Sequence, residues 1–259
     1  MNVLFIGDVV AKAGCEKLQQ VLPTLKRQYN AAVTVVNGEN SADGNGITPG
    51  SLQILFDAGA DVVTTGNHAF RRRECYDAFE TQEFLLRPAN FPASAPGKGV
   101  CIIDRGAFRM AVVNLMGAVN MHPQLSDPFA TMDAVLAELA QQGIRTVLLD
   151  LHAEATGEKR ALAFYLDGRV SALVGTHTHV QTADEEILPN GTAYLTDAGM
   201  SGPTLSCLGV EPSLAIAMMK DKLPVRFTTA QTPCTVQGAV IEIDPKTGRS
   251  LSIHRICVK

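Results

Sequence analysis

The 259-residue sequence predicts an α/β fold whose functional site lies at the carboxyl ends of β-strands. Short apolar runs alternate with segments of helical spacing, as expected for strands joined by helices. In the first 70 residues, three of these runs end in a glycine followed by polar side chains that can bind metals or transfer protons. In α/β sheets such side chains gather at the carboxyl edge, where ligands bind.

The first part of the chain contains these strand–helix units. The predicted strands are rich in β-branched or aliphatic residues and cover 3–6, 33–37 and 61–65. Apolar residues at helical spacing predict an amphipathic helix over 14–29, which Pro23 could kink. A second helix is predicted from Thr48-Pro49, an N-cap followed by a proline in the first turn, to about Ala58.

The second part mixes helices with further strands. Residues 84–99 contain three prolines and predict an irregular connection. An antiparallel hairpin is predicted from 99–105 and 109–115. Helices are predicted over 129–142 and 159–166, and strands over 146–149 and 171–174. The remaining chain is predicted to be mostly β, with strands over 191–195, 238–243 and 251–257.

The composition is that of an ordinary globular protein, with 46% hydrophobic and 19% charged residues, and we expect one domain over 1–259. The net charge is −4 and the basic residues are scattered, which argues against an extended nucleic-acid surface. No apolar stretch approaches membrane-spanning length and the N-terminus lacks a signal-peptide pattern, so we expect no membrane association and a cytoplasmic protein. The six cysteines form no C-x-x-C pair, which predicts reduced and mostly buried thiols.

Polar residues at the ends of the predicted strands form the candidate site. They are Asp8, Glu39, Asn40, Asn67, His68, His152, His177 and His179. Carboxylate, amide and imidazole ligands together suit iron, manganese or zinc, whereas an all-carboxylate set would suit magnesium or calcium. Glu39 has two oxygens and could bridge two metal ions about 3.5–4 Å apart, as in two-metal hydrolases.

Each candidate also has a purely structural interpretation. An aspartate after a strand often caps a helix, asparagines often satisfy turns, and a single histidine is more often structural than a ligand. Four of the six histidines nevertheless fall at predicted strand ends beside glycine-led polar residues, which chance capping does not explain. His122 and His254 lie outside this pattern and are interpreted as surface or packing residues.

The polar blocks resemble the ordered motifs of the calcineurin-like metallophosphoesterases, which run GD, GD, GNH, a lone H and GHxH. The blocks in this sequence are Gly7-Asp8, Gly38-Glu39-Asn40, Gly66-Asn67-His68, His152 and Gly175-Thr176-His177-Thr178-His179. The second block, the loop 44–48 and the segment 196–200 are more similar to the bacterial YmdB-like subgroup. The resemblance covers nearly the whole chain and implies a layered sandwich of mixed β-sheets flanked by helices, with the metal site at the carboxyl ends of strands.

Two departures from the superfamily pattern agree with this subgroup. Val10 stands where the superfamily has a histidine, and Glu39 replaces the usual bridging aspartate. The resemblance implies two metal ions per chain, with iron expected and manganese or zinc as alternatives. The first metal would take Asp8, Glu39, Asn40 and His179, and the second would take Glu39, Asn67, His152 and His177. His68 would bind no metal.

The resemblance further implies a phosphodiesterase acting on 2′,3′-cyclic nucleotides. A hydroxide bridging the two metals would attack phosphorus, and His68 would protonate the leaving oxygen. The expected partner is a small phosphodiester, and homo-oligomerisation is left open. The loop 41–47, Phe70 and the arginines 71–73 could contact substrate, but a simple turn, a packed aromatic and solvated arginines are the preferred interpretations.

Three other functions are alternatives to a phosphodiesterase. A phosphomonoesterase or phosphoprotein phosphatase could use the same metal centre. A non-catalytic regulator could keep the fold and bind RNA or a partner protein, although the full ligand set argues against it. A two-metal amidohydrolase would usually bring an early His-x-His, whereas this chain places its pair late, at His177 and His179.

Overall fold

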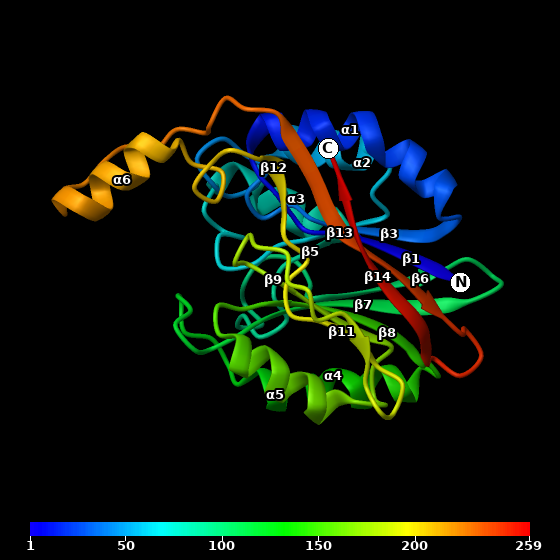
Figure 1. Cartoon of the computed structure of the whole chain (residues 1–259). Coiled ribbons are helices and arrows are strands. Elements are labelled where there is room, and N and C mark those ends of the chain that lie inside the picture. The colour runs from blue at the N-terminus through cyan, green and yellow to red at the C-terminus, as the bar shows by residue number, and fades with distance from the viewer.

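Two mixed β-sheets pack face to face in the computed structural model, which describes residues 1–259, and helices cover their outer faces (Figure 1). The first sheet has the order β2-β12-β13-β1-β3-β4-β5, with β14 paired to β13. Its strands are β1 (Asn2–Ile6), β2 (Asp8–Val9), β3 (Ala31–Asn37), β4 (Val62–Thr64), β5 (Leu85–Leu86), β12 (Met200–Pro203), β13 (Cys234–Ile243) and β14 (Ser250–Val258). β1 runs parallel to β3 and antiparallel to β13, so this sheet is mixed.

The second sheet has the order β10-β11-β9-β8-β7-β6. Its strands are β6 (Val100–Asp104), β7 (Arg109–Met116), β8 (Thr146–His152), β9 (Ala172–Thr176), β10 (Glu186–Ile187) and β11 (Ala193–Leu195). The helices are α1 (Ala11–Gln28), α2 (Pro49–Ala58), η1 (Arg73–Cys75), α3 (Tyr76–Thr81), α4 (Pro128–Gln141), α5 (Thr156–Leu166) and α6 (Pro212–Asp221). The architecture confirms the predicted sandwich of mixed sheets flanked by helices.

Three apolar layers hold the sandwich together. Side chains on β1 alternate between two of these layers. Val3 and Phe5 pack between the two sheets, whereas Leu4 and Ile6 pack under α1 and α2. The third layer lies between the second sheet and helices α4 and α5. Burying each such side chain stabilises the fold by about 1.5–3 kcal/mol, so these layers hold the strand ends in fixed positions.

Most predicted elements are confirmed, with shifted boundaries. Helix α1 continues past Pro23, which lies inside it. The antiparallel hairpin of β6 and β7 is as predicted. Strand β8 runs three residues beyond its predicted end, as far as His152, and α5 begins at Thr156 instead of 159. The prediction ended β8 too early because Asp150 and His152 are polar and suggested a loop. Both residues are instead part of the strand and are buried.

The structure also contains elements that the sequence pattern missed. The connection 84–99 starts with the short strand β5, and η1 and α3 precede it. Strands β10 and β12 are two and four residues long, too short to show a period of two. Helix α6 projects away from the body of the molecule (Figure 1), and only Ala215 in it is buried.

None of the helices combines the length and the apolar character that crossing a bilayer requires.

The six thiols divide into two groups. Cys15, Cys75 and Cys101 are buried, whereas Cys207 and Cys257 are exposed and Cys234 is intermediate, so only half of the thiols fulfil the expected burial. Burial raises the pKa of Cys15 and Cys101 to about 12 and that of Cys75 to about 11. Because the thiolate is the reactive form, a maleimide should label Cys207 and Cys257 in the native protein and the three buried thiols only after unfolding. Peptide mass mapping of the label tests this; labelling of Cys101 in the native protein would contradict it.

Candidate metal centre

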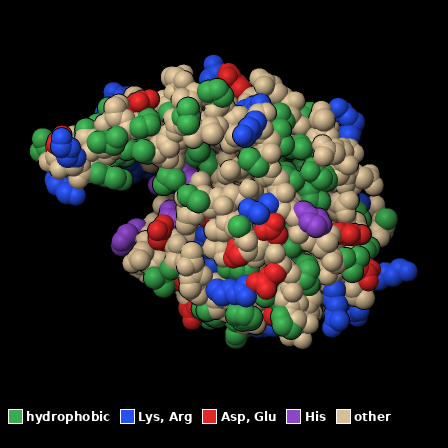
Figure 2. All heavy atoms as spheres, viewed as in Figure 1, with side chains coloured by type: hydrophobic (Ala, Val, Ile, Leu, Met, Phe, Trp, Pro, Cys, Tyr) green, Lys and Arg blue, Asp and Glu red, His purple; other side chains and the backbone are tan.

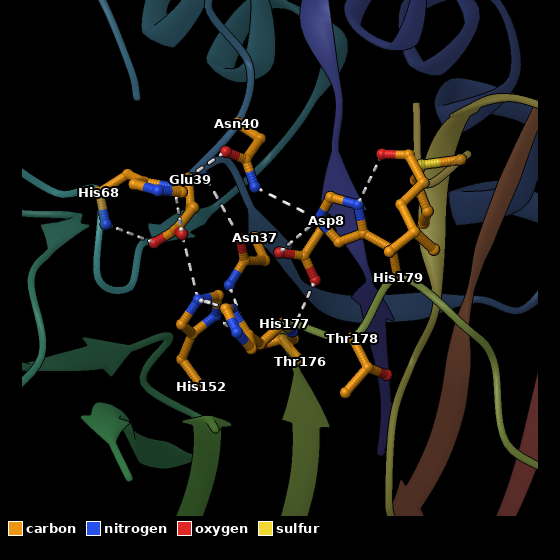
Figure 3. A network of polar contacts seen from close by, with 12 residues as sticks. Asp8, Asn37, Glu39, Asn40, His68, His152, Thr176, His177, Thr178 and His179 are labelled. Atoms are coloured by element: carbon orange, nitrogen blue, oxygen red, sulfur yellow. Dashed lines mark hydrogen bonds and ion pairs between the residues drawn. The ribbon is translucent and has the colours of Figure 1, made fainter. Parts of the chain in front are cut away.

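The eight candidate residues come together where strands of both sheets end. Figure 3 labels seven of them, and the eighth, Asn67, contacts His152. Asp8 lies in β2, and Glu39 and Asn40 follow β3. Asn67 and His68 follow β4, His152 is the last residue of β8, and the two remaining histidines follow β9. Because β3 is parallel to β4 and β8 is parallel to β9, each sheet delivers its polar residues to one edge. The packing of the two sheets brings these edges together.

His152 lies at the centre of one group of potential ligands. Its Nε2 is 3.1 Å from Oε1 of Glu39, 3.0 Å from Oδ1 of Asn67 and 3.1 Å from Nδ1 of His177. Ligand atoms of Glu39, His152 and His177 all lie within 4.8 Å of one another. Glu39 and His152 are fully buried. These are the four residues that the resemblance assigns to the second metal.

Asp8, Asn40 and His179 form the neighbouring group. Nε2 of His179 is 3.6 Å from Oδ1 of Asp8 and 3.3 Å from Nδ2 of Asn40. Nδ1 of His179 contacts the carbonyl oxygen of Leu208 at 3.1 Å, which orients the ring. With Glu39 beside them, these residues are the set that the resemblance assigns to the first metal.

A relay of hydrogen bonds fixes the orientation of His152. Oγ1 of Thr176 donates to Oδ1 of Asp150 at 2.7 Å, so that Thr176 accepts at 2.9 Å from Nδ1–H of His152. Asp150 is itself buried and also accepts from Asn37 at 2.9 Å. With Nδ1 protonated, Nε2 offers its lone pair toward Glu39 and Asn67, as a metal ligand would.

The residues fit a bound cation. Oδ1 of Asp8 and Oε1 of Glu39 are buried carboxylate oxygens without a hydrogen bond, although imidazole nitrogens lie close to both. Unpaired buried carboxylate oxygens are costly, and a cation between them would satisfy both. The site also requires space: a Cβ at Gly66 would lie 2.1 Å from Cδ2 of His152 and 2.2 Å from Oε2 of Glu39. The mixed carboxylate, amide and imidazole set suits a transition metal.

The pKa values of the site residues also show that this site favours a positive charge. Burial alone would lower the pKa of His152, but the attraction of Glu39 outweighs it and raises this pKa to about 9. Burial would raise the pKa of Glu39, and His152 and His68 instead hold it well below its usual range. Burial and the neighbouring His152 lower the pKa of His177 to about 4. Without a metal, the proton on His152 supplies the missing positive charge.

Metal affinity should therefore fall as the pH falls. A metal ion held by His152 would displace a proton that the metal-free protein keeps up to about pH 9. Below that pH the affinity should decrease by up to about tenfold per pH unit. Calorimetric titration with Mn²⁺ at pH 6.5, 7.5 and 8.5, in buffers of different ionisation enthalpy, measures both the affinity and the released proton. An affinity independent of pH would contradict this.

The strand before His177 and His179 ends two residues later than predicted. The strand continues through Gly175 and Thr176, and the two histidines follow it with φ angles of 99° and 62°, where non-glycine residues are strained. The pair is thus placed by a turn and not by strand alternation. The backbone N–H of His177 donates to Oδ2 of Asp8 at 3.1 Å, which ties the turn to β2.

A buried ion pair between Lys159 and Asp197 stabilises this turn. Nζ of Lys159 donates to Oδ2 of Asp197 at 2.9 Å and to the carbonyl oxygen of Thr176 at 2.8 Å. The same carboxylate oxygen accepts from the backbone N–H of Thr178 at 3.0 Å and from its hydroxyl at 2.8 Å. Lys159 and Asp197 are fully buried. Thr178 lies between the two histidines, so the pair fixes the positions of both.

His68 lies at the rim of the centre. Its Nδ1 is 2.9 Å from Oε1 of Glu39 and 3.2 Å from Oδ1 of Asn40, and its backbone N–H donates to Oε2 of Glu39 at 3.2 Å. Its side chain is 30% exposed, more than those of the other three histidines in the cluster. His68 can therefore contact a bound substrate while Glu39 and Asn40 orient its ring.

The other features singled out in the sequence lie outside the centre. His122 and His254 are exposed. Phe70 packs against Tyr76, Phe79 and Phe91, as expected for a packed aromatic. Arg72 is not simply solvated, because its guanidinium donates to the carbonyl oxygens of Asp43 and Asn45 and so fixes the loop 41–47.

The paired mixed sheets and the polar cluster at their ends define a metallophosphoesterase fold. A structure of the NAD nucleotidase of Haemophilus influenzae shares this fold with a TM-score of 0.64 at 14% identity, covering 99% of this chain and 55% of that one. Within this class the family is also defined. Residues 4–256 match the model of the YmdB-like proteins, and the chain belongs to that family.

Two further proteins are similar over nearly their full length. A 2′,3′-cyclic-nucleotide 2′-phosphodiesterase of Bacillus subtilis is 46% identical over 258 residues, which cover 100% of this chain and 97% of that protein. The crystal structure of a novel phosphatase from Mycoplasma pneumoniae has a TM-score of 0.93 at 30% identity, covering 100% of this chain and 93% of the other. The predicted membership in the YmdB-like subgroup is thereby confirmed.

The supporting residues were not identified from the sequence. Asp150 directly follows the predicted strand 146–149 and Thr176 belongs to the block that carries His177, but both lie inside the observed strands and contact residues on other strands, which a local pattern does not show. Lys159 lies on a helix face among apolar neighbours. Asp197 belongs to the segment 196–200, which contributed to the resemblance, but nothing in that segment predicted its contact with Thr178. A lysine on the buried face of a helix is the signal that could have pointed to a partner carboxylate.

Proposed function

We propose that this protein is a phosphodiesterase that hydrolyses 2′,3′-cyclic nucleotides at a centre of two metal ions. The observation that carries the proposal is the pair of unpaired buried oxygens on Asp8 and Glu39, each beside its own group of imidazole and amide ligands. The ligands would be divided as the resemblance implies, with Glu39 shared between the two metals. Iron is the expected metal, with manganese or zinc as alternatives.

The bound metal ions would supply Lewis acidity for water and for the phosphoryl oxygens. The side chains of the protein would supply proton donation and the orientation of the metal ligands. Oδ1 of Asn40 accepts from Nδ1 of His68, which also lies 2.9 Å from Oε1 of Glu39, and this leaves Nε2 of His68 free to donate a proton to the leaving oxygen. The relay through Thr176 and Asp150 keeps His152 in the tautomer that leaves its Nε2 free for a metal.

The substrate class is supported by the name of the Bacillus subtilis relative, a 2′,3′-cyclic-nucleotide 2′-phosphodiesterase. A strained cyclic diester is also chemically suited to a site with one proton donor at its rim. A cytoplasmic location, as expected from the sequence, is part of the proposal. A phosphomonoesterase is the second candidate, since the same centre serves both ester classes.

Elemental analysis of the freshly purified protein, combined with assays on 2′,3′-cyclic AMP and 3′-AMP, tests the proposal. We expect about two transition-metal ions per chain and turnover of the cyclic diester at least tenfold above that of the monoester. Faster hydrolysis of 3′-AMP would favour the phosphomonoesterase. A fully metal-loaded protein that hydrolyses neither ester would instead favour a binding regulator.

A His68→Asn variant separates proton donation from metal binding. Turnover of 2′,3′-cyclic AMP should fall by about 10²–10⁴-fold, the usual contribution of a general acid, while the metal content persists. Bis(4-nitrophenyl) phosphate has a leaving group that needs no proton, so its hydrolysis should fall much less. Steady-state assays on both substrates and metal analysis provide the measurement; equal losses on both substrates would contradict the acid role.

A further inference from the structure

A cleft of about 870 Å³ opens directly beside the proposed metal centre. Asn40 and His179 of the proposed centre line it together with residues 226–229 and Gln231. The surface is hollowed between the projecting α6 and the body, and histidine atoms are visible in that hollow (Figure 2). The volume lies near the upper end of the ~300–1,000 Å³ typical of small-molecule sites, so the cleft has room for more than a reacting phosphate and its ribose.

Two side chains of the cleft lack the aromatic or ionic partners that similar side chains have elsewhere in the molecule. Phe227 is 40% exposed and stacks on no other aromatic ring. Arg226 is exposed and makes no ion pair, unlike Arg105, Arg160 and Arg169, which pair with carboxylates elsewhere on the surface. An aromatic ring and a guanidinium adjacent in sequence and both lining the cleft are available to a ligand.

The other charged groups of the cleft are already engaged. Arg72 donates to the carbonyl oxygens of Asp43 and Asn45. The carboxylate of Asp43 accepts from the backbone N–H of Lys12 at 3.2 Å. Arg226 is therefore the charged side chain of the cleft that has neither a hydrogen-bond partner nor an ion-pair partner, and its charge is positive. Thr228, Thr229 and Gln231 add neutral hydrogen-bonding groups.

These groups match the parts of a nucleotide. Every base has a π-face that can stack on an aromatic ring, and the stacking tolerates different bases. A guanidinium binds phosphate oxygens through two parallel hydrogen bonds. Since the metal centre would hold the reacting phosphate, the phosphate that Arg226 binds must be a second one.

We propose that the cleft binds the 3′ end of a short oligoribonucleotide that terminates in a 2′,3′-cyclic phosphate. Phe227 stacks on a base next to the reacting phosphate, and Arg226 binds the phosphodiester on the 5′ side of the terminal nucleoside. The inference rests on the proposed function and narrows its substrate class. A single free arginine contacts one backbone phosphate only, which agrees with a chain of net charge −4 without an extended basic face. The preceding reaction would be RNA cleavage by attack of a 2′-hydroxyl, which leaves this terminus.

The test compares 2′,3′-cyclic AMP with the dinucleotide ApA that carries a terminal 2′,3′-cyclic phosphate. We expect the holoenzyme to hydrolyse the dinucleotide with at least tenfold higher kcat/KM. Arg226→Ala should abolish most of this preference, and Phe227→Ala should lower kcat/KM for both substrates by about 5- to 150-fold, the range of one lost stacking contact. Calorimetry with 3′-AMP and with ApAp, the products that retain a 3′-phosphate, should show the same order of affinities without turnover.

The matched controls are Phe164→Ala and Arg145→Ala. Phe164 is an exposed aromatic on α5 and Arg145 an exposed arginine before β8, and neither lines the cleft. Both variants should keep the preference for the dinucleotide. Metal analysis of all four variants verifies that the centre is intact.

The two proposals fail in different ways. Equal kcat/KM for the two substrates, unchanged in Arg226→Ala, would overturn the oligonucleotide inference and leave a cyclic mononucleotide phosphodiesterase. Failure of the holoenzyme to hydrolyse these substrates or bis(4-nitrophenyl) phosphate would overturn the proposed function itself. Tight binding of ApAp in that case, lost in Arg226→Ala, would retain the cleft as a nucleotide site.

Discussion

Replacing Glu39 by glutamine should remove most of the bound metal and lower phosphodiesterase activity by at least about a thousandfold. Glu39 is fully buried and lies between His68 and His152, with Oε1 2.9 Å and 3.1 Å from their ring nitrogens. Glutamine keeps the shape but has one oxygen and no charge, so it cannot bridge two cations. The loss should exceed the 10–100-fold typical of residues that only orient ligands. Elemental analysis and a diester assay on the same preparation measure both effects.

Glu154→Gln is the matched control for this variant. Glu154 contacts Nε2 of His177 at 3.2 Å, but its side chain is 50% exposed and it belongs to neither proposed ligand set. Removing this charge from the rim should change metal content and activity by less than about threefold, since solvent screens exposed charges. If both variants lost metal equally, the total negative charge of the site would matter and not the bridging position of Glu39.

The positions of the candidate residues could be predicted from sequence because each follows an apolar run. β-branched runs such as 33–37 and 61–65 form strands in any mixed sheet, and a glycine followed by polar residues marks the point where the chain leaves the core. All eight candidate residues indeed lie at one place in the structure: Figure 3 labels seven of them, and Asn67 contacts His152. Their roles as metal ligands and proton donor are still predictions, since proximity alone does not establish them.

The rest of the architecture depends on contacts that a local pattern cannot contain. Strand β12 pairs with β2 and β13, segments almost 200 residues and 30 residues away in the sequence, and it has only four residues. Helix α6 begins at a proline after Glu211 and is apolar on most sides, so its pattern resembles a buried strand as much as an exposed helix. The left-handed backbone conformation at His177 and His179 likewise depends on tertiary contacts, because non-glycine residues rarely adopt a positive φ angle by themselves.

Lys159→Met should be the most destabilising substitution outside the candidate ligands. The lysine is fully buried, and its ammonium donates to Asp197 and to the carbonyl oxygen of Thr176. Methionine would fill most of the space but leave a buried carboxylate without its counter-charge. Removing one partner of a buried ion pair costs about 3–5 kcal/mol, which urea denaturation would measure as a lower free energy of unfolding. Arg160 is the next residue of the same helix and forms an exposed ion pair with Glu186. Arg160→Met breaks this pair and should lower the free energy of unfolding by less than about 1 kcal/mol.

The Lys159 variant should also weaken metal binding, although Lys159 contacts no candidate ligand side chain. Asp197 holds Thr178 through both its backbone N–H and its hydroxyl, and the two flanking histidines keep strained φ angles only while this turn is fixed. A double variant, Lys159→Met with Asp197→Asn, removes both charges and should recover part of the lost stability, because no buried charge is then unpaired. It should not recover metal affinity, since the amide is a weaker acceptor for Thr178. Recovery of both properties together would mean that the pair serves stability alone and does not position the histidines.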